Sequence, residues 1–374
     1  MPAPYSKPIS YSKIVSGVPA VTPFVGPETI ERRLGATFSL RLGANESSFG
    51  ISPKAKAAMA AELDRVSWYC DPEHFDLRQR LAADLGVGID NLVVGEGIDG
   101  LLGLIVRAFT DPGAAIVTSA GAYPTFNYHV LGYGGRLEFV PYRADGRNDL
   151  EALVEAARRS AAKLLYLANP DNPSGTFLGR AEVEAALDRL PEDCLFVLDE
   201  AYAEFAPPEE VPPIDAADTR LIRLRTFSKA HGMAGLRLGY AIAAEDVIAT
   251  FQKIRLHFGV GRLSQVAALA SLDDPDFAAG VVRQVAAGRG DYEALARDHN
   301  LAFIPSLTNF VAIDLESAER SLRMVELLEA RGVFVRRPGV APLDRFVRVS
   351  VGTPEERAGF AKAFADALGA LRGA

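Results

Sequence analysis

Cysteine and histidine are scarce in this sequence of 374 residues. Cys70 and Cys194 are its two cysteines, which excludes a disulfide framework and a Cys-x-x-Cys metal motif. The five histidines never fall at the HxxxH or HExxH spacing of a zinc site. The sequence therefore gives little support to metal catalysis, and we expect no metal.

Long hydrophobic runs and basic runs are also missing. No stretch approaches the roughly 20 apolar residues of a membrane span, and the first residues lack the apolar core of a secretion signal. The net charge of −8 and the scattered lysines and arginines argue against a nucleic-acid-binding surface or a basic membrane-binding face. We therefore expect a cytoplasmic protein that binds neither nucleic acid nor membrane.

The chain does have a regular alternation of apolar and helical segments. From Asn91 to about residue 243, short apolar segments alternate with polar turns and helical segments. This pattern predicts an α/β fold with a mostly parallel sheet covered on both faces. We expect a proline-rich N-terminal arm at 1–35, a large domain at 36–275 that carries this sheet, and a small α+β domain at 276–374.

Polar residues of different chemistry follow consecutive predicted strands. Asn172, Asp199, Tyr202 and Lys229 all lie just past the ends of apolar segments. In open α/β sheets, ligands bind outside the carboxyl ends of the strands. Four polar side chains at one edge of the sheet therefore predict a binding site, because a purely structural role would scatter them.

Lys229 lies in a turn that also contains Thr226, Ser228 and Arg237. A lysine held among anion-binding groups suits Schiff-base chemistry on a phosphorylated cofactor. An isolated turn lysine is more often an exposed residue, so this interpretation depends on the other strand-end residues.

The segment Gly95–Gly100 matches the pattern GxGxxG between a predicted strand and a predicted helix. A dinucleotide site also needs an acidic residue about 20 positions further on, and residues 118–122 contain none. We therefore disfavour a nicotinamide oxidoreductase. Backbone amides of this turn are expected to cradle a phosphate at a helix N-terminus, with a tight turn that binds nothing as the alternative.

Taken in order, these motifs resemble the fold-type I pyridoxal-phosphate aminotransferases, and within them the histidinol-phosphate aminotransferase branch. The matching segments are residues 42–46, 69–72, 95–99, 124–126, 169–175, 199–202, 228–237 and 346–354. Each motif is weak alone, whereas the ordered set spans nearly the whole chain. The resemblance implies an aspartate aminotransferase-like fold with a seven-stranded-type sheet, and a homodimer with sites at the subunit interface.

The resemblance also implies pyridoxal 5'-phosphate as the cofactor. Lys229 would bond to the cofactor aldehyde and act as the base on the substrate α-carbon. Asp199 would pair with the ring nitrogen, while Tyr202 and Asn172 would hydrogen-bond the ring oxygen. Phe126 would stack on the ring face, with an ordinary core position as the alternative.

The cofactor phosphate would lie in the turn near residue 97. The residues that the resemblance implies around it are Gly97, Ile98, Asp99, Thr226, Ser228 and Arg237. Tyr69 would reach the phosphate of the neighbouring subunit, unless it is a local aromatic residue beside Trp68.

Arginines would bind the substrate. Arg348 would clamp the α-carboxylate in a bidentate pair. Arg336 and the adjacent Arg337 would bind a phosphate or carboxylate on the substrate side chain, with solvated arginines as the alternative. The chain has Phe24 where this branch tends to carry a tyrosine, so the substrate stays open between histidinol phosphate and an aromatic amino acid.

The function expected from these residues is a transaminase that moves an amino group between such an amino acid and a 2-keto acid such as 2-oxoglutarate. A decarboxylase or lyase on the same fold, similar to threonine-phosphate decarboxylase, needs the same cofactor groups and is the alternative. A transcriptional regulator with an aminotransferase-like domain would need an N-terminal helix-turn-helix, and residues 1–35 are too short and too rich in proline for one.

Overall fold

The computed structural model describes residues 9–19 and 25–373. Part of the expected arm at 1–35, including Phe24, lies outside these residues. The described part of the arm contains two short helices, α1 (Lys13–Ser16) and α2 (Pro27–Leu34). Within the described ranges, no helix is both long enough and apolar enough to cross a membrane.

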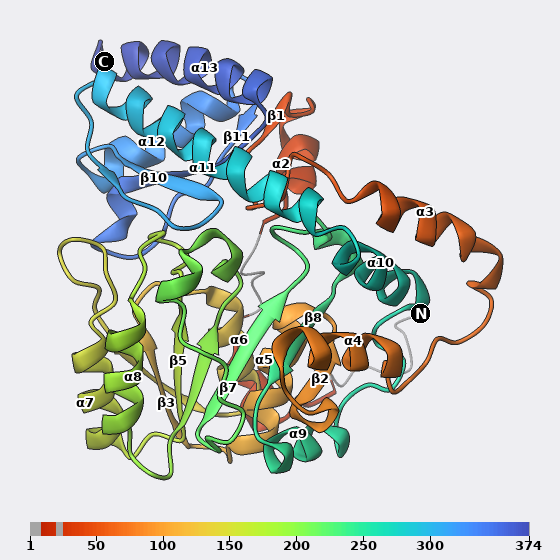
Figure 1. The fold of residues 1–374 in the computed structure, drawn as a ribbon. Coiled ribbons are helices and arrows are strands. Elements are labelled where there is room, and N and C mark those ends of the chain that lie inside the picture. Colours follow the sequence, from red (N-terminus) through yellow and green to blue (C-terminus); the bar gives the residue numbers. More distant parts are fainter. Residues whose placement is uncertain (1–8, 20–24, 374) are drawn as a thin grey trace, which may run out of the picture.

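A seven-stranded sheet forms the centre of the molecule (Figure 1), in the order β2-β8-β7-β6-β5-β3-β4. β8 runs antiparallel to both of its neighbours, and the other pairings are parallel. The expected mostly parallel sheet is therefore confirmed. The strands are β2 (Leu92–Gly95), β3 (Ala115–Ser119), β4 (Arg136–Val140), β5 (Leu164–Ala168), β6 (Leu195–Asp199), β7 (Leu221–Thr226) and β8 (Gly239–Ile242).

Helices cover both faces of this sheet. Because successive side chains of a strand point to opposite faces, Tyr166 packs into one core, and Leu165 and Leu167 pack into another. The helices of the first core are α5 (Gly97–Phe109), α6 (Pro124–Gly132) and α9 (Glu245–Gln252). Those of the second core are α7 (Leu150–Ser160) and α8 (Arg180–Arg189). A third group, α3 (Pro53–Ala61), α4 (Phe75–Leu85) and α10 (Arg262–Leu272), packs beside β2 and β8.

A smaller C-terminal layer lies against the sheet at the end where the parallel strands finish (Figure 1). Its three-stranded antiparallel sheet has the order β12-β10-β9. Its elements are α11 (Pro275–Asp298), β9 (Phe303–Ile304), β10 (Phe310–Asp314), α12 (Ala318–Glu329), β11 (Val333–Phe334), β12 (Phe346–Ser350) and α13 (Pro354–Arg372). Short 3₁₀ helices occupy Leu63–Arg65, Ile89–Asn91, Ala203–Phe205, Pro208–Glu210, Ala234–Leu236 and Leu343–Arg345.

An early segment of the chain joins this C-terminal layer. β1 (Leu40–Arg41) pairs in parallel with β11, and Leu42 is buried in the same core as Val347 and Phe360. Residues 40–42 therefore pack with the C-terminal layer, although the sequence pattern groups them with the segment 36–275. This arrangement brings residues 43–46 to the space between the two layers.

A buried ion-pair network joins the residue after β6 to two arginines of β7. The Glu200 carboxylate accepts hydrogen bonds from the guanidinium groups of Arg223, at 2.5 and 3.0 Å, and of Arg225, at 3.1 Å. The Glu200 and Arg223 side chains are each 1% exposed. Removing one partner from a buried pair leaves an uncompensated charge, which costs far more than a surface pair is worth.

We therefore expect Glu200→Gln to destabilise the fold by about 3–5 kcal/mol, since two arginines lose their buried counter-charge. The urea midpoint of unfolding, followed by circular dichroism, measures this loss. Glu209→Gln makes the same chemical change at an exposed position and should leave the midpoint nearly unchanged. Equal midpoints for the two variants would contradict the assigned role of Glu200.

Candidate active site

A cavity of about 400 Å³ opens where β5, β6 and β7 end. Its walls come from both layers, because Asn45 and Arg348 face the ends of the parallel strands across it. Of the residues proposed from the sequence, the cavity brings together Ile98, Asp99, Asn172, Asp199, Tyr202, Thr226, Ser228, Lys229, Arg237 and Arg348. The expectation that strand-end residues converge is thus met by the described geometry.

Lys229 follows β7 and extends into this cavity. Its Nζ atom donates a hydrogen bond to the main-chain oxygen of Asn45 at 3.0 Å and lies 5.6 Å from the ring centre of Tyr202. Burial, and then the positive charge of Arg348, lower the pKa of the lysine from 10.5 to about 8. The side chain can therefore lose its proton near neutral pH, as a nucleophilic or basic lysine must.

Asp199 ends β6 with its carboxylate turned toward the same cavity. It accepts hydrogen bonds from the Tyr166 hydroxyl at 2.8 Å and from the Ala201 amide at 3.0 Å. Burial raises the pKa of this carboxyl to about 6, although both hydrogen bonds favour the charged form. A buried carboxylate in this state is suited to face a cationic ring nitrogen.

Glycine geometry creates an anion-binding corner at the start of α5. Gly97 has φ of 73°, and a Cβ atom there would lie 2.6 Å from Nη2 of Arg237. Only glycine fits this conformation with the arginine so close. The first amides of α5 have no partners within the helix, and the Thr226 and Ser228 hydroxyls lie 2.9 Å apart beside them.

The arginine at this corner, Arg237, already faces one carboxylate. The Arg237 guanidinium lies 3.6 Å from the Asp99 carboxylate and is about half exposed, at 49%. Tyr123 donates its hydroxyl proton to the same carboxylate at 2.7 Å. The corner therefore combines amide, hydroxyl and guanidinium donors, the set that a phosphate requires.

Arg348 reaches the cavity from β12 in the C-terminal layer. One guanidinium nitrogen donates to the side-chain oxygen of Asn172, another donates to the main-chain oxygen of Gly43 at 3.2 Å, and the group lies 5.0 Å from the ring centre of Phe310. Burial lowers the pKa of Arg348 to about 10. Because the Asn172 oxygen accepts from Arg348, the Asn172 amino group is the donor that remains for a ligand.

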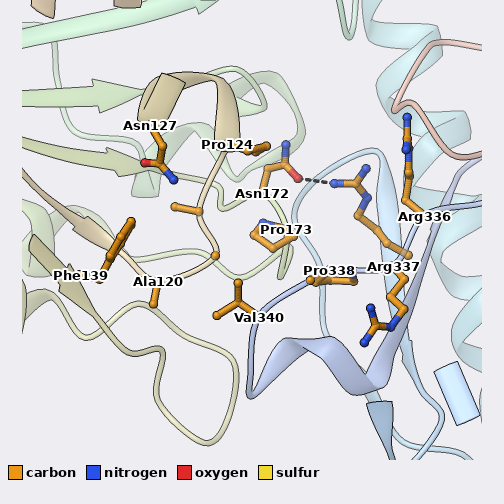
Figure 2. A pocket seen from close by; sticks show the side chains of 14 residues that line it. Ala120, Pro124, Asn127, Phe139, Asn172, Pro173, Arg336, Arg337, Pro338 and Val340 are labelled. Carbon is orange, nitrogen blue, oxygen red and sulfur yellow. Dashed lines mark hydrogen bonds between the residues drawn. The ribbon is translucent and has the colours of Figure 1, made fainter. Parts of the chain in front are cut away.

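A second cavity, of about 470 Å³, is drawn in Figure 2. Its lining shares Asn172 and Arg348 with that of the first cavity. Arg336 and Arg337 lie on one side of it, and Phe139 and Val340 give it apolar walls. The main chains of positions 336 and 348 exchange hydrogen bonds of 3.2 and 2.7 Å. Arg336 is therefore held next to the arginine of the first cavity.

Phe126 does not line the first cavity. Phe126 is 0% exposed and stacks on Tyr166, with ring centres 4.3 Å apart, so it belongs to the core. Tyr123, three positions earlier, lines the first cavity instead. The physical reason is the turn before Pro124: α6 directs position 126 into the protein, whereas position 123 precedes the helix and faces the cavity.

Tyr69 lies outside the cavity of its own chain. It is 80% exposed, and its ring centre is 4.6 Å from that of Phe258. Tyr69 therefore does not line the cavity of its own chain.

Sequence reasoning missed Asn45, Tyr123 and Tyr166 as members of the site. Tyr166 gives a usable signal, because it is a hydroxyl-bearing residue in the otherwise apolar strand Leu164–Ala168. Asn45 falls in the matching segment 42–46, but that motif gave it no role, and Tyr123 lies in the turn before α6, where no local pattern separates it from an ordinary turn residue.

Comparison with known proteins identifies the family. The family profile described as aminotransferase class I and II matches residues 39–364. The chain belongs to this family.

Individual relatives agree with this assignment. Histidinol-phosphate aminotransferase 2 of Carboxydothermus hydrogenoformans is 38% identical over 339 residues, which cover 89% of this chain and 92% of the relative. The crystal structure of histidinol-phosphate aminotransferase from Sinorhizobium meliloti, in complex with pyridoxal-5'-phosphate, has a TM-score of 0.94 at 44% identity, and the match covers 98% of this chain and 99% of that one.

A more distant structure bears on the fold alone. A mutant of Thermus thermophilus aspartate aminotransferase has a TM-score of 0.80 at 23% identity, with coverage of 96% of this chain and 100% of that one. The expected aspartate aminotransferase-like fold is therefore confirmed for this aminotransferase.

The environment of Lys229 predicts how its amine reacts in the protein without cofactor. Acylation of Lys229, followed across pH by peptide mass mapping, should rise with a midpoint at about 8. Arg348→Met should move the midpoint upward, because removing a nearby cation favours the ammonium form. The exposed Lys253 supplies the reference curve in the same digest. A Lys229 midpoint at the ordinary value of 10.5, or one insensitive to Arg348, would contradict this account.

Proposed function

We propose that this aminotransferase uses pyridoxal 5'-phosphate bound covalently to Lys229 to move amino groups between an amino acid and a 2-keto acid. The observation that carries the proposal is the placement of Lys229 and Asp199 in one cavity, with the anion-binding corner at Gly97 beside them. The Sinorhizobium relative, crystallised with this cofactor at 44% identity, supports the same reading.

The residues present fit this cofactor. Gly97, Ser228 and Arg237 would hold its phosphate, and Asp199 would face its ring nitrogen as a negative partner. Because Gly97 has no side chain, the Arg237 guanidinium can lie against this turn, where a Cβ atom would come within 2.6 Å of its Nη2. When bound, the cofactor supplies an electron sink for the carbon from which a proton is removed.

The chain's own side chains would divide the remaining work. Lys229, which loses its proton near neutral pH, would take the proton from the substrate α-carbon and return it to the product. Arg348 would bind the substrate α-carboxylate with its guanidinium fork. Tyr123 would cover the ring face, the role that the sequence resemblance gave to Phe126.

Borohydride reduction followed by peptide mapping tests the covalent attachment. The reduced cofactor should be found on the peptide that contains Lys229, because this lysine combines access to the cavity with a pKa of about 8. Lys229→Gln should give no adduct, although the variant should still bind the cofactor through its phosphate at the anion-binding corner. An adduct on another lysine, or none in the native protein, would overturn the proposal.

The substrate would extend into the second cavity, where Arg336 offers a positive charge beside apolar walls. Such a cavity suits histidinol phosphate or an aromatic amino acid as donor, with 2-oxoglutarate as the keto acid. The names of the relatives at 38% and 44% identity support the first of these. They also disfavour the alternative of a decarboxylase or lyase.

A half-reaction screen separates these donors. Histidinol phosphate should convert the cofactor to its amine form faster than phenylalanine does, and Arg336→Met should raise the KM for histidinol phosphate about tenfold or more with little change for phenylalanine. Arg331→Met, in the exposed turn after α12, is the matched control. If both donors react equally well and Arg336→Met changes neither, the narrow substrate assignment is wrong and the wider class remains.

The working unit would be a homodimer in the cytoplasm. Exposed apolar side chains come from two segments that meet at the Tyr69–Phe258 contact, and contiguous patches of this kind mark interaction surfaces. The exposed apolar residues are Leu63, Val66, Trp68, Tyr69, Leu256 and Phe258. On this surface Tyr69 would reach the phosphate in the partner's cavity. The two free cysteines suit a reducing compartment.

A further inference from the structure

Asn45 has no assigned role in the proposed reaction, yet it makes several polar contacts to residues of the site. It is 2% exposed and has φ of 54°, a left-handed conformation that asparagine tolerates better than most residues. Its main-chain oxygen accepts from Lys229 Nζ and from Asn309 Nδ2, each at 3.0 Å. Its side chain contacts Tyr202 and Ser350. One residue between the two layers thus touches the reactive lysine and the tyrosine beside it.

Ser350 fixes which way the Asn45 amide points. The Asn45 main-chain N–H donates to Ser350 Oγ at 2.9 Å, so this oxygen acts as an acceptor. The Ser350 hydroxyl proton then goes to Asn45 Oδ1 at 3.2 Å. With its oxygen turned to Ser350, the amide must present its NH₂ group to Tyr202.

The orientation of the amide in turn decides the role of the Tyr202 hydroxyl. Asn45 Nδ2 donates to the Tyr202 oxygen at 2.8 Å, so that oxygen accepts and its own proton must point elsewhere. Tyr202 lines the cavity, and the burial that surrounds it raises its pKa to about 12. Its proton therefore stays on the hydroxyl and is available on the cavity side.

We propose that Asn45 is a positioning residue that makes the Tyr202 hydroxyl donate its proton into the cavity, toward the ring oxygen of the bound cofactor. The part of this inference that names the cofactor ring oxygen rests on the proposed function. The relay runs from the Asn45 main chain through Ser350 and back through the Asn45 amide to Tyr202. It connects Ser350 of the C-terminal layer to the hydroxyl of Tyr202, which lies in the turn that follows β6.

Asn45→Asp tests the relay because it keeps the shape and replaces the donor by an acceptor. A carboxylate at this position would take the Tyr202 proton away from the cavity. The affinity for pyridoxal 5'-phosphate, measured by fluorescence quenching, should fall about tenfold or more. In a Tyr202→Phe background the same substitution should change the affinity by no more than about twofold, since the group it acts through is gone. An equal loss in both backgrounds would overturn the proposal.

A second measurement does not depend on the cofactor. The C–O stretch of Tyr202, isolated as the infrared difference between the protein and Tyr202→Phe, reports whether the hydroxyl accepts a hydrogen bond. The cofactor-free protein should show an accepting hydroxyl, and Asn45→Asp should abolish that component. An unchanged stretch in Asn45→Asp would overturn the proposal even where cofactor binding is lost. Native protein that takes up no cofactor would sink the proposed function, and the stretch would still decide the role of Asn45.

Two further variants control for charge and folding. Asn309→Asp places the same charge on a residue that contacts Asn45 but not Tyr202, and it should leave the Tyr202 stretch in place. Ser350→Ala removes the group that orients the amide without adding a charge, and it should weaken the accepting component. A Tyr202 stretch that changes in Asn309→Asp as much as in Asn45→Asp would assign the effect to charge alone and refute the relay.

Discussion

Asp199 and Arg348 are buried beside one cavity and Lys229 is partly buried there, and the rest of the site depends on their removal from water. Removal from water disfavours the charged form of each, which lowers the pKa of the two cations and raises that of the carboxyl. As a result, the lysine and the aspartate titrate at about 8 and about 6, values from which protons move readily at neutral pH.

Burial of this kind is tolerated because each charge keeps directed hydrogen bonds. Tyr166 and an amide hold Asp199, the Asn45 main chain holds Lys229, and Asn172 holds Arg348. Two of these bonds, Lys229–Asn45 and Arg348–Asn172, cross between the central sheet and the C-terminal layer. The electrostatics of the site therefore exist only while the two layers remain in contact.

The location of the site could be predicted from the sequence, and parts of its lining could not. Parallel strands end at one edge of a sheet, so Asp199 and Lys229 had to be close once the strand pattern was recognised. Whether Tyr123 or Phe126 lines the cavity depends on where α6 begins, and that is set by a turn whose packing the local pattern does not show. The contacts of Asn45 were equally hidden, because its partners Tyr202 and Ser350 lie 157 and 305 positions away along the chain.

The alternation of a β-strand explains how Asp199 can be followed by another buried carboxylate. Asp199 faces the side of the sheet on which Tyr166 lies, whereas Glu200 turns to Arg223, whose neighbours Ile222 and Leu224 both point to the Tyr166 side. Two arginines neutralise Glu200 on its own side. Glu200 thus has its own counter-charges on that side, and the two arginines do not have to be shared with Asp199.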